Sequence, residues 1–122
     1  MQRPVDAGVR SRLAALIDEA RAGEAAFRMA YGPAERAAGA AGAPQSESWI
    51  AAQELLSALE AARAPTSRAV GEIDALAGER VHGTGGIGAS DLTAIRAAAD
   101  EVGALDQRQA AEIKALTARL SH

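Results

Sequence analysis

The residues most readily linked to a known chemistry form a glycine-rich run at positions 83–88, Gly-Thr-Gly-Gly-Ile-Gly. This run matches the G-x-G-x-x-G pattern, which binds the phosphates of dinucleotides when a strand precedes it and a helix follows. A helical pattern does follow, but residues 77–81 before the run end another helical pattern, and Asp91 would place a negative charge beside the phosphate. We therefore expect a flexible connection between two helices. A small-ligand or anion site that uses the loop at 82–88 is the alternative.

Histidine, cysteine and neighbouring carboxylates offer few further candidates. The chain has no cysteine, and its two histidines are His82 and the last residue, His122. This composition excludes disulfides, zinc–thiolate sites, iron–sulfur clusters and thiol nucleophiles. His82 is expected at the end of a helix, where its charged form is favoured, with a ligand contact as the alternative. The neighbouring acids fall outside the apolar lines of the sequence and are expected to face water. We therefore expect no catalytic residue, no metal site and no cofactor, and we do not expect the protein to be an enzyme.

Three more side chains occupy positions where a ligand contact is the less favoured of two interpretations. Gln109 interrupts an apolar line, where a buried amide can fix the register of packed helices. Tyr31 and Trp49 lie on either side of the Gly/Ala-rich segment 39–44. We expect these two aromatic residues to close one end of a helical bundle. For all three residues, contact with a ligand or a partner is the second interpretation.

Four small residues share one face of a predicted helix: Ala64, Gly71, Ala75 and Gly78. Positions two residues apart are separated by about 200° around a helix, so this face lies opposite the apolar line through Ile73. A glycine inside a helix costs about 1 kcal/mol relative to alanine, and two glycines seven residues apart favour close contact with another helix. That helix would belong to a second copy of the chain. A tolerated exposed face is the alternative.

The elements that position these residues are predicted to be helices. Apolar residues recur at alternating steps of three and four over about 6–31, 46–81 and 90–120. In the first segment this line, or seam, consists of Val9, Leu13, Leu16, Ala20, Gly23, Phe27 and Ala30. This spacing is typical of amphipathic helices that pack along a seam, and no segment alternates with the period of two that a strand requires. The sequence therefore predicts an all-α fold, an elongated antiparallel bundle of three long helices that forms a single domain over 1–122.

Two prolines and two serines predict where these helices are interrupted and begin. Pro33 follows Gly32 at the end of the first segment, and Pro65 lies inside the second. Proline lacks a backbone N–H and clashes with the preceding turn, so we expect kinks or breaks that could divide the bundle into four or five pieces. Ser46 or Ser48 is expected to cap the second helix.

Composition and charge restrict the possible partners. The chain has 33 alanines but only 26 large apolar residues, which predicts a thin core, and its formal net charge is −3. Five arginines near the N-terminus are interleaved with acids, which favours a solvated, ion-paired face over a phosphate-binding one: Arg10, Arg12, Arg21, Arg28 and Arg36. We therefore expect no nucleic-acid partner. No run of 18 apolar residues is present for a membrane span, and Asp6 precedes any apolar stretch, which is unlike a signal peptide. We therefore expect a cytoplasmic protein without a membrane partner.

These observations favour a non-enzymatic helical-bundle protein that acts by self-association or by binding a protein partner. A domain of this length with so few large side chains gains stability by sharing its core across a dimer, so we expect a homodimer. A bundle that binds a small ligand or an anion is the alternative, with its site in the 82–88 loop or at the Tyr31/Trp49 end.

Overall fold

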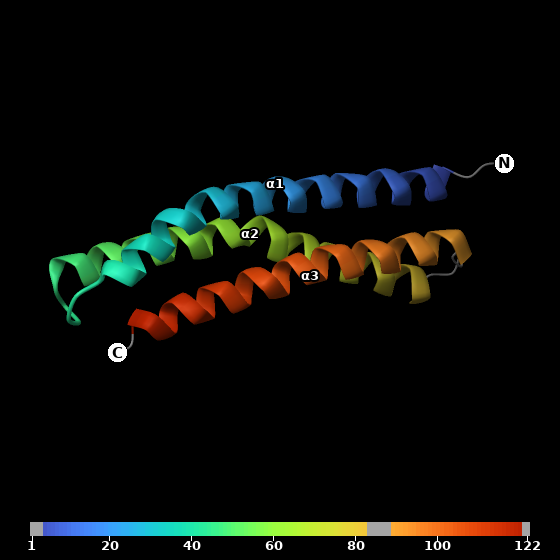
Figure 1. The fold of residues 1–122 in the computed structure, drawn as a ribbon. Helices are drawn as coiled ribbons and strands as arrows, with labels where there is room; N and C mark the ends of the chain where they lie inside the picture. The colour runs from blue at the N-terminus through green and yellow to red at the C-terminus, as the bar shows by residue number, and fades with distance from the viewer. Residues whose placement is uncertain (1–3, 83–88, 121–122) are drawn as a thin grey trace.

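Three helices form an elongated bundle (Figure 1). The computed structural model describes the backbone of residues 4–82 and 89–120, and the side chains of residues 8–78 and 91–120. The helices are α1 (Pro4–Ala40), α2 (Glu47–His82) and α3 (Ala89–Leu120), and the described residues contain no strand. Each helix packs against both others. The chain runs along the bundle in α1, returns in α2 and runs forward again in α3 (Figure 1), so the predicted all-α bundle of three long helices is confirmed.

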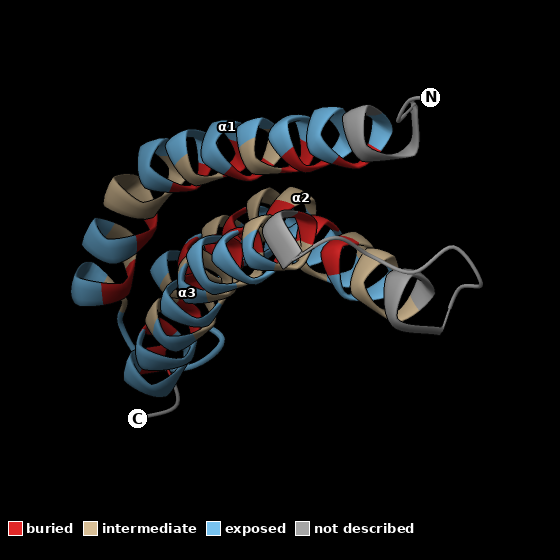
Figure 2. Cartoon of the chain, turned by 90° about the vertical axis from the view of Figure 1, so that its right-hand side faces the viewer, coloured by how far each residue is buried: buried red, intermediate tan, exposed pale blue. Residues whose placement is uncertain are grey.

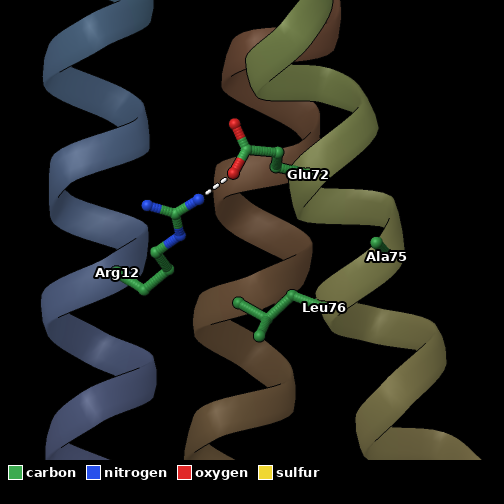
Figure 3. A pocket seen from close by; sticks show the side chains of 4 residues that line it. All are labelled: Arg12, Glu72, Ala75 and Leu76. Carbon is green, nitrogen blue, oxygen red and sulfur yellow. Dashed lines mark hydrogen bonds and ion pairs between the residues drawn. The ribbon is translucent and has the colours of Figure 1, made fainter.

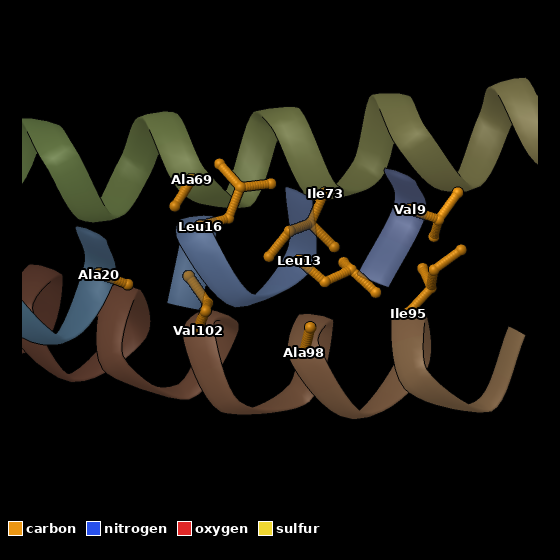
Figure 4. Packing of buried hydrophobic residues seen from close by; sticks show 9 residues of the cluster. All are labelled: Val9, Leu13, Leu16, Ala20, Ala69, Ile73, Ile95, Ala98 and Val102. Carbon is orange, nitrogen blue, oxygen red and sulfur yellow. The ribbon is translucent and has the colours of Figure 1, made fainter. Parts of the chain in front are cut away.

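The core consists of two apolar clusters that follow one another along the bundle. Buried residues lie along the inward faces of the helices, while the outward faces are exposed (Figure 2). The first cluster is drawn in Figure 4: Val9, Leu13, Leu16, Ala20, Ala69, Ile73, Ile95, Ala98 and Val102. The second cluster lies towards the other end: Phe27, Ala34, Ala38, Ala52, Leu56, Leu59, Ile113, Leu116 and Leu120. Most of these residues belong to the predicted seams, and the many alanines allow the helices to pack closely.

Kinks or breaks were expected at the two prolines, and breaks do not occur, because α1 continues through Pro33 and α2 continues through Pro65. Beyond Pro33, Ala34 and Ala38 are buried in the second cluster, and this burial offsets the backbone hydrogen bond that proline removes. Figure 2 shows that α1 changes direction towards its C-terminal end but stays a continuous helix. The bundle therefore has three pieces instead of four or five.

The connection between α1 and α2 is a short turn followed by a helix cap. The backbone N–H of Ser46 donates to the carbonyl oxygen of Ala43 at 3.0 Å, and Gln45 has a positive φ of 74°. Ser46 is the cap of α2, because its Oγ accepts a hydrogen bond from the backbone N–H of Trp49 at 3.3 Å. Of the two serines that the sequence offered as caps, Ser46 thus fills the role. The turn brings the start of α2 beside the end of α1.

Candidate functional site

A layer of polar side chains separates the two apolar clusters. It contains Glu24 of α1, Arg63 and Thr66 of α2, and Gln109 of α3, and we call it the polar layer. Thr66 and Gln109 are both 0% exposed, which confirms that Gln109 lies on the packed face of its helix. The amide Nε2 of Gln109 donates a hydrogen bond to Oε1 of Glu24 at 2.7 Å. This bond joins α3 to α1 at one level of the bundle, as expected of an amide that fixes helix register.

Glu24 is the acceptor for three donors in this layer. Its Oε2 accepts from Nε of Arg28 at 2.8 Å and from Arg108, while its Oε1 accepts from Gln109. Burial of the carboxylate opposes its ionisation, but the hydrogen bonds from Gln109 and Arg28 and the charges of Arg28 and Arg108 outweigh burial, so the pKa of Glu24 is lowered. A carboxylate held in this way is a poor general base near neutral pH. The sequence counted Glu24 only among the acids interleaved with the N-terminal arginines, and its contacts with Arg108 and Gln109 of α3 had no local signal.

Three buried polar atoms of the layer have no hydrogen-bond partner in the protein. They are Oγ1 of Thr66, Oε1 of Gln109 and Nε of Arg63, whose Nη2 nevertheless pairs with Asp106 at 3.0 Å. A buried polar atom without a partner costs on the order of 1–3 kcal/mol. The polar layer is therefore not the most stable way to fill this level of the bundle. The hydrogen bond between Gln109 and Glu24 forms only when these two residues of α3 and α1 lie at the same level of the bundle.

Ion pairs between helices surround the core, and they use most of the arginines that the sequence singled out. Four pairs join α1 to α3: Arg10–Asp91, Arg21–Glu101, Arg28–Glu112 and Glu24–Arg108. Their members are 80 to 84 residues apart in the sequence, a nearly constant offset that fits two parallel helices. The prediction of an ion-paired face is confirmed for Arg10, Arg12, Arg21 and Arg28, although most of their partners lie on other helices. These pairs oppose binding of an anion by the same arginines.

Tyr31 and Trp49 both pack against the second apolar cluster. Trp49 lies in the first turn of α2, at the end of the bundle, whereas Tyr31 lies nine residues before the end of α1. The indole N–H of Trp49 donates to the carbonyl oxygen of Leu120 at 3.0 Å, which ties the start of α2 to the end of α3. The ring of Tyr31 stacks on Phe27 with centroids 6.3 Å apart, and its hydroxyl donates to Glu35 at 3.4 Å. Burial and the charge of Glu35 raise the pKa of Tyr31. The polar atoms of this end are thus bonded within the chain, and a ligand contact here stays a prediction.

The small-residue face of α2 is not covered by the described part of the chain. Ala64, Gly71 and Ala75 are exposed, and Gly78 is half-buried. A Cβ atom added at Gly71 or Gly78 would meet nothing within 4 Å. Neither glycine is therefore required for packing among the described helices, and contact with a second copy stays a prediction.

A shallow hollow of about 150 Å³ lies between α1 and α2, lined by Arg12, Glu72, Ala75 and Leu76 (Figure 3). Arg12 points across it to an ion pair with Glu72. Because these two charges neutralise one another, the hollow presents no net charge for an ionic ligand. Its volume is also well below the ~300–1,000 Å³ of ordinary ligand pockets.

The last predicted ligand site lies at the C-terminal end of α2. His82 is the final residue of that helix, but its side chain and the rest of the 82–88 loop lie outside the described residues.

Among the side chains that are described, no three His, Asp or Glu residues are grouped to hold a metal ion. None of the described helices has an apolar stretch long enough to cross a membrane. No family model, no curated protein and no solved structure matches this chain.

Proposed function

We propose that the protein is a non-enzymatic helical-bundle protein that acts by associating with a second copy of itself. The observation that carries this proposal is the uncovered outward face of α2, which presents small residues and two glycines, seven residues apart, where an added Cβ would meet nothing within 4 Å. Ala64, Gly71 and Ala75 are exposed on this face, and the space beside Gly71 is empty to 4 Å. Small side chains let a second helix approach closely, so more backbone and side-chain atoms can come into contact.

The state of the ionisable groups supports a role without catalysis. Glu19 of α1 and Glu72 of α2 form ion pairs with Arg68 and Arg12. Glu24, the acid of the polar layer, has a lowered pKa. A carboxylate with a lowered pKa is poorly suited to accept a proton near neutral pH.

The first test is the absolute mass in solution, measured by light scattering after size exclusion over a tenfold range of concentration. We expect a mass near twice the 12.4 kDa of the monomer at high concentration. A mass of one chain at every concentration would contradict self-association.

A matched pair of variants tests which surface is used. Gly71→Gln adds a long uncharged side chain to the exposed face of α2, where nothing in the chain opposes it. Gly103→Gln makes the same change on α3, also at a position with nothing within 4 Å of an added Cβ. Both changes favour the helix, so neither should unfold the monomer. We expect Gly71→Gln to lower the dimer fraction and Gly103→Gln to leave it unchanged. Equal behaviour of the two variants would contradict the use of α2.

A further inference from the structure

The outermost line of α2 is a continuous stripe of exposed positions at the spacing of a helix–helix seam. The steps between its members alternate between four and three: Ile50, Glu54, Ser57, Ala61, Ala64, Arg68, Gly71 and Ala75. We call this line the outer stripe. All eight residues are exposed, and Ile50, with 45% of its surface exposed, is one of the few large apolar residues that the structure leaves exposed. The same alternation of steps aligns two helices that pack along each other.

The charges on the outer stripe are arranged symmetrically. Its only charged members are Glu54 and Arg68, and each lies seven residues from Ala61. At ~1.5 Å per residue, each lies roughly 10 Å from Ala61 along the helix. A twofold axis through Ala61, perpendicular to α2, would therefore place Glu54 of each copy opposite Arg68 of the other. In a parallel arrangement, by contrast, Glu54 would face Glu54 and Arg68 would face Arg68.

Both charged groups are able to make such a contact. Among the described residues Glu54 makes no ion pair or hydrogen bond, and its side chain is exposed. Arg68 directs Nε and Nη2 to a single oxygen of Glu19, which leaves its Nη1 donors unused. The side chain of Arg68 is 61% exposed.

The remaining stripe residues also fit an antiparallel second copy. The same axis brings Ile50 of one copy to within about one residue of Gly71 of the other. Gly71 has empty space where a Cβ would be, so an exposed isoleucine would enter an open position. Between the charged residues the stripe carries only Ser57, Ala61 and Ala64, which allow the two helix axes to approach closely.

We propose that two copies of the chain associate through antiparallel packing of their α2 helices, about a twofold axis at Ala61, with reciprocal Glu54–Arg68 ion pairs. This inference rests on the proposed self-association and adds its surface and its orientation. The symmetric placement of opposite charges is the observation that selects a second copy of the chain as the occupant of the stripe.

Charge reversal tests the orientation, because each single variant should weaken the dimer and the two changes combined should restore it. Glu54→Arg places like charges opposite each other twice in its own dimer, and so does Arg68→Glu. We expect each to raise the dissociation constant of the dimer about tenfold or more at low salt, and less at high salt. Sedimentation equilibrium at several salt concentrations measures this change.

Recovery of the dissociation constant in two further samples tests whether Glu54 and Arg68 pair with each other. The double variant Glu54→Arg/Arg68→Glu should recover the dissociation constant to within about threefold, and so should an equimolar mixture of the two single variants. In a dimer of one copy of each variant, both contacts again pair opposite charges. Failure of both restorations would overturn the reciprocal pairing.

Two control variants separate the stripe from other effects of charge. Asp100→Arg makes the same change of net charge on an exposed position of α3, and Glu19→Gln removes the ion pair that Arg68 makes within the chain. We expect neither to weaken the dimer more than about twofold. If the wild-type chain dimerises and Glu54→Arg weakens the dimer no more than Asp100→Arg does, the proposed orientation is overturned but self-association stands. A wild-type chain that is monomeric throughout would overturn both.

Discussion

Gly23 marks a close approach of α1 to α2, and replacing it with alanine gives a quantitative test of how tightly the bundle is packed. An added Cβ would lie 3.2 Å from Cβ of Pro65, 3.2 Å from Oγ1 of Thr66 and 3.7 Å from the backbone nitrogen of Thr66. Ordinary van der Waals contacts of a Cβ are at 3.4–4 Å. The neighbours cannot swing away freely, because one is a proline ring and the other is a fully buried threonine.

Two opposing effects decide the result of Gly23→Ala. Alanine favours a helix interior over glycine by about 1 kcal/mol. Overpacking a close contact costs about 1–3 kcal/mol. The net change is therefore an expected loss of ~0–2 kcal/mol in the free energy of unfolding. Gly103→Ala is the matched control, since its Cβ would meet nothing within 4 Å, and it should gain about 1 kcal/mol.

Urea denaturation followed by circular dichroism, at one fixed protein concentration, measures both variants. Their free energies of unfolding should differ by ~1–3 kcal/mol, which for a chain of this length corresponds to roughly 4–12 °C in Tm. A gain in Gly23→Ala as large as that in Gly103→Ala would refute the reasoning. It would mean that the approach of α1 to Pro65 and Thr66 is looser than the structure has it.

Three further predictions concern the polar layer and the aromatic end. Thr66→Val removes a buried hydroxyl without a partner at nearly constant shape, so the free energy of unfolding should rise by about 1 kcal/mol in urea denaturation; a loss would mean that the hydroxyl is bonded. The pKa of Glu24 is lower in the folded chain than its ordinary 4.5, so the stability that it contributes is complete above pH 4.5 and is lost as the pH falls through the lower, folded value. Glu24→Gln should therefore be less stable than wild type near pH 7 and lose less stability on acidification, and parallel pH profiles of the two proteins would contradict this. Trp49→Phe removes the hydrogen bond to Leu120, which should lower the free energy of unfolding by ~0.5–1.5 kcal/mol. It should also speed amide hydrogen exchange in the last turn of α3, and unchanged exchange there would show that the bond does not hold the helix end.

The periodicity of apolar residues determined the number and type of the elements. One seam was predicted for the first helix: Val9, Leu13, Leu16, Ala20, Gly23, Phe27 and Ala30. Six of these seven residues are buried, and Ala30 is half-buried. Such a prediction succeeds because helix geometry is local, so the spacing of apolar residues fixes which of them share a face. The cap at Ser46 is local for the same reason, since its hydroxyl bonds to a backbone group three residues away.

The fate of the prolines was decided by packing between helices. Local chemistry predicts a kink or a break at Pro65, but α2 continues because Gly23 of α1 leaves room for the proline ring and the apolar clusters on both sides hold the helix. Likewise, Ala34 and Ala38 follow Pro33 and are buried only because α2 and α3 are present. A propensity of about 3 kcal/mol against proline is small beside the burial of a whole helix face.

The candidate site shows the same division between local and distant information. Sequence alone placed Gln109 on an apolar line and the small residues of α2 on one face, because both statements depend on helix geometry. It left open that Gln109 bonds to Glu24, 85 residues away, and that Arg10 and Arg21 pair with acids on α3. These partners depend on the relative register of the helices, which is set by contacts between residues distant in the sequence. Local helix geometry therefore allows each helix and its faces to be predicted from the sequence, whereas packing between distant residues fixes which faces and charges meet.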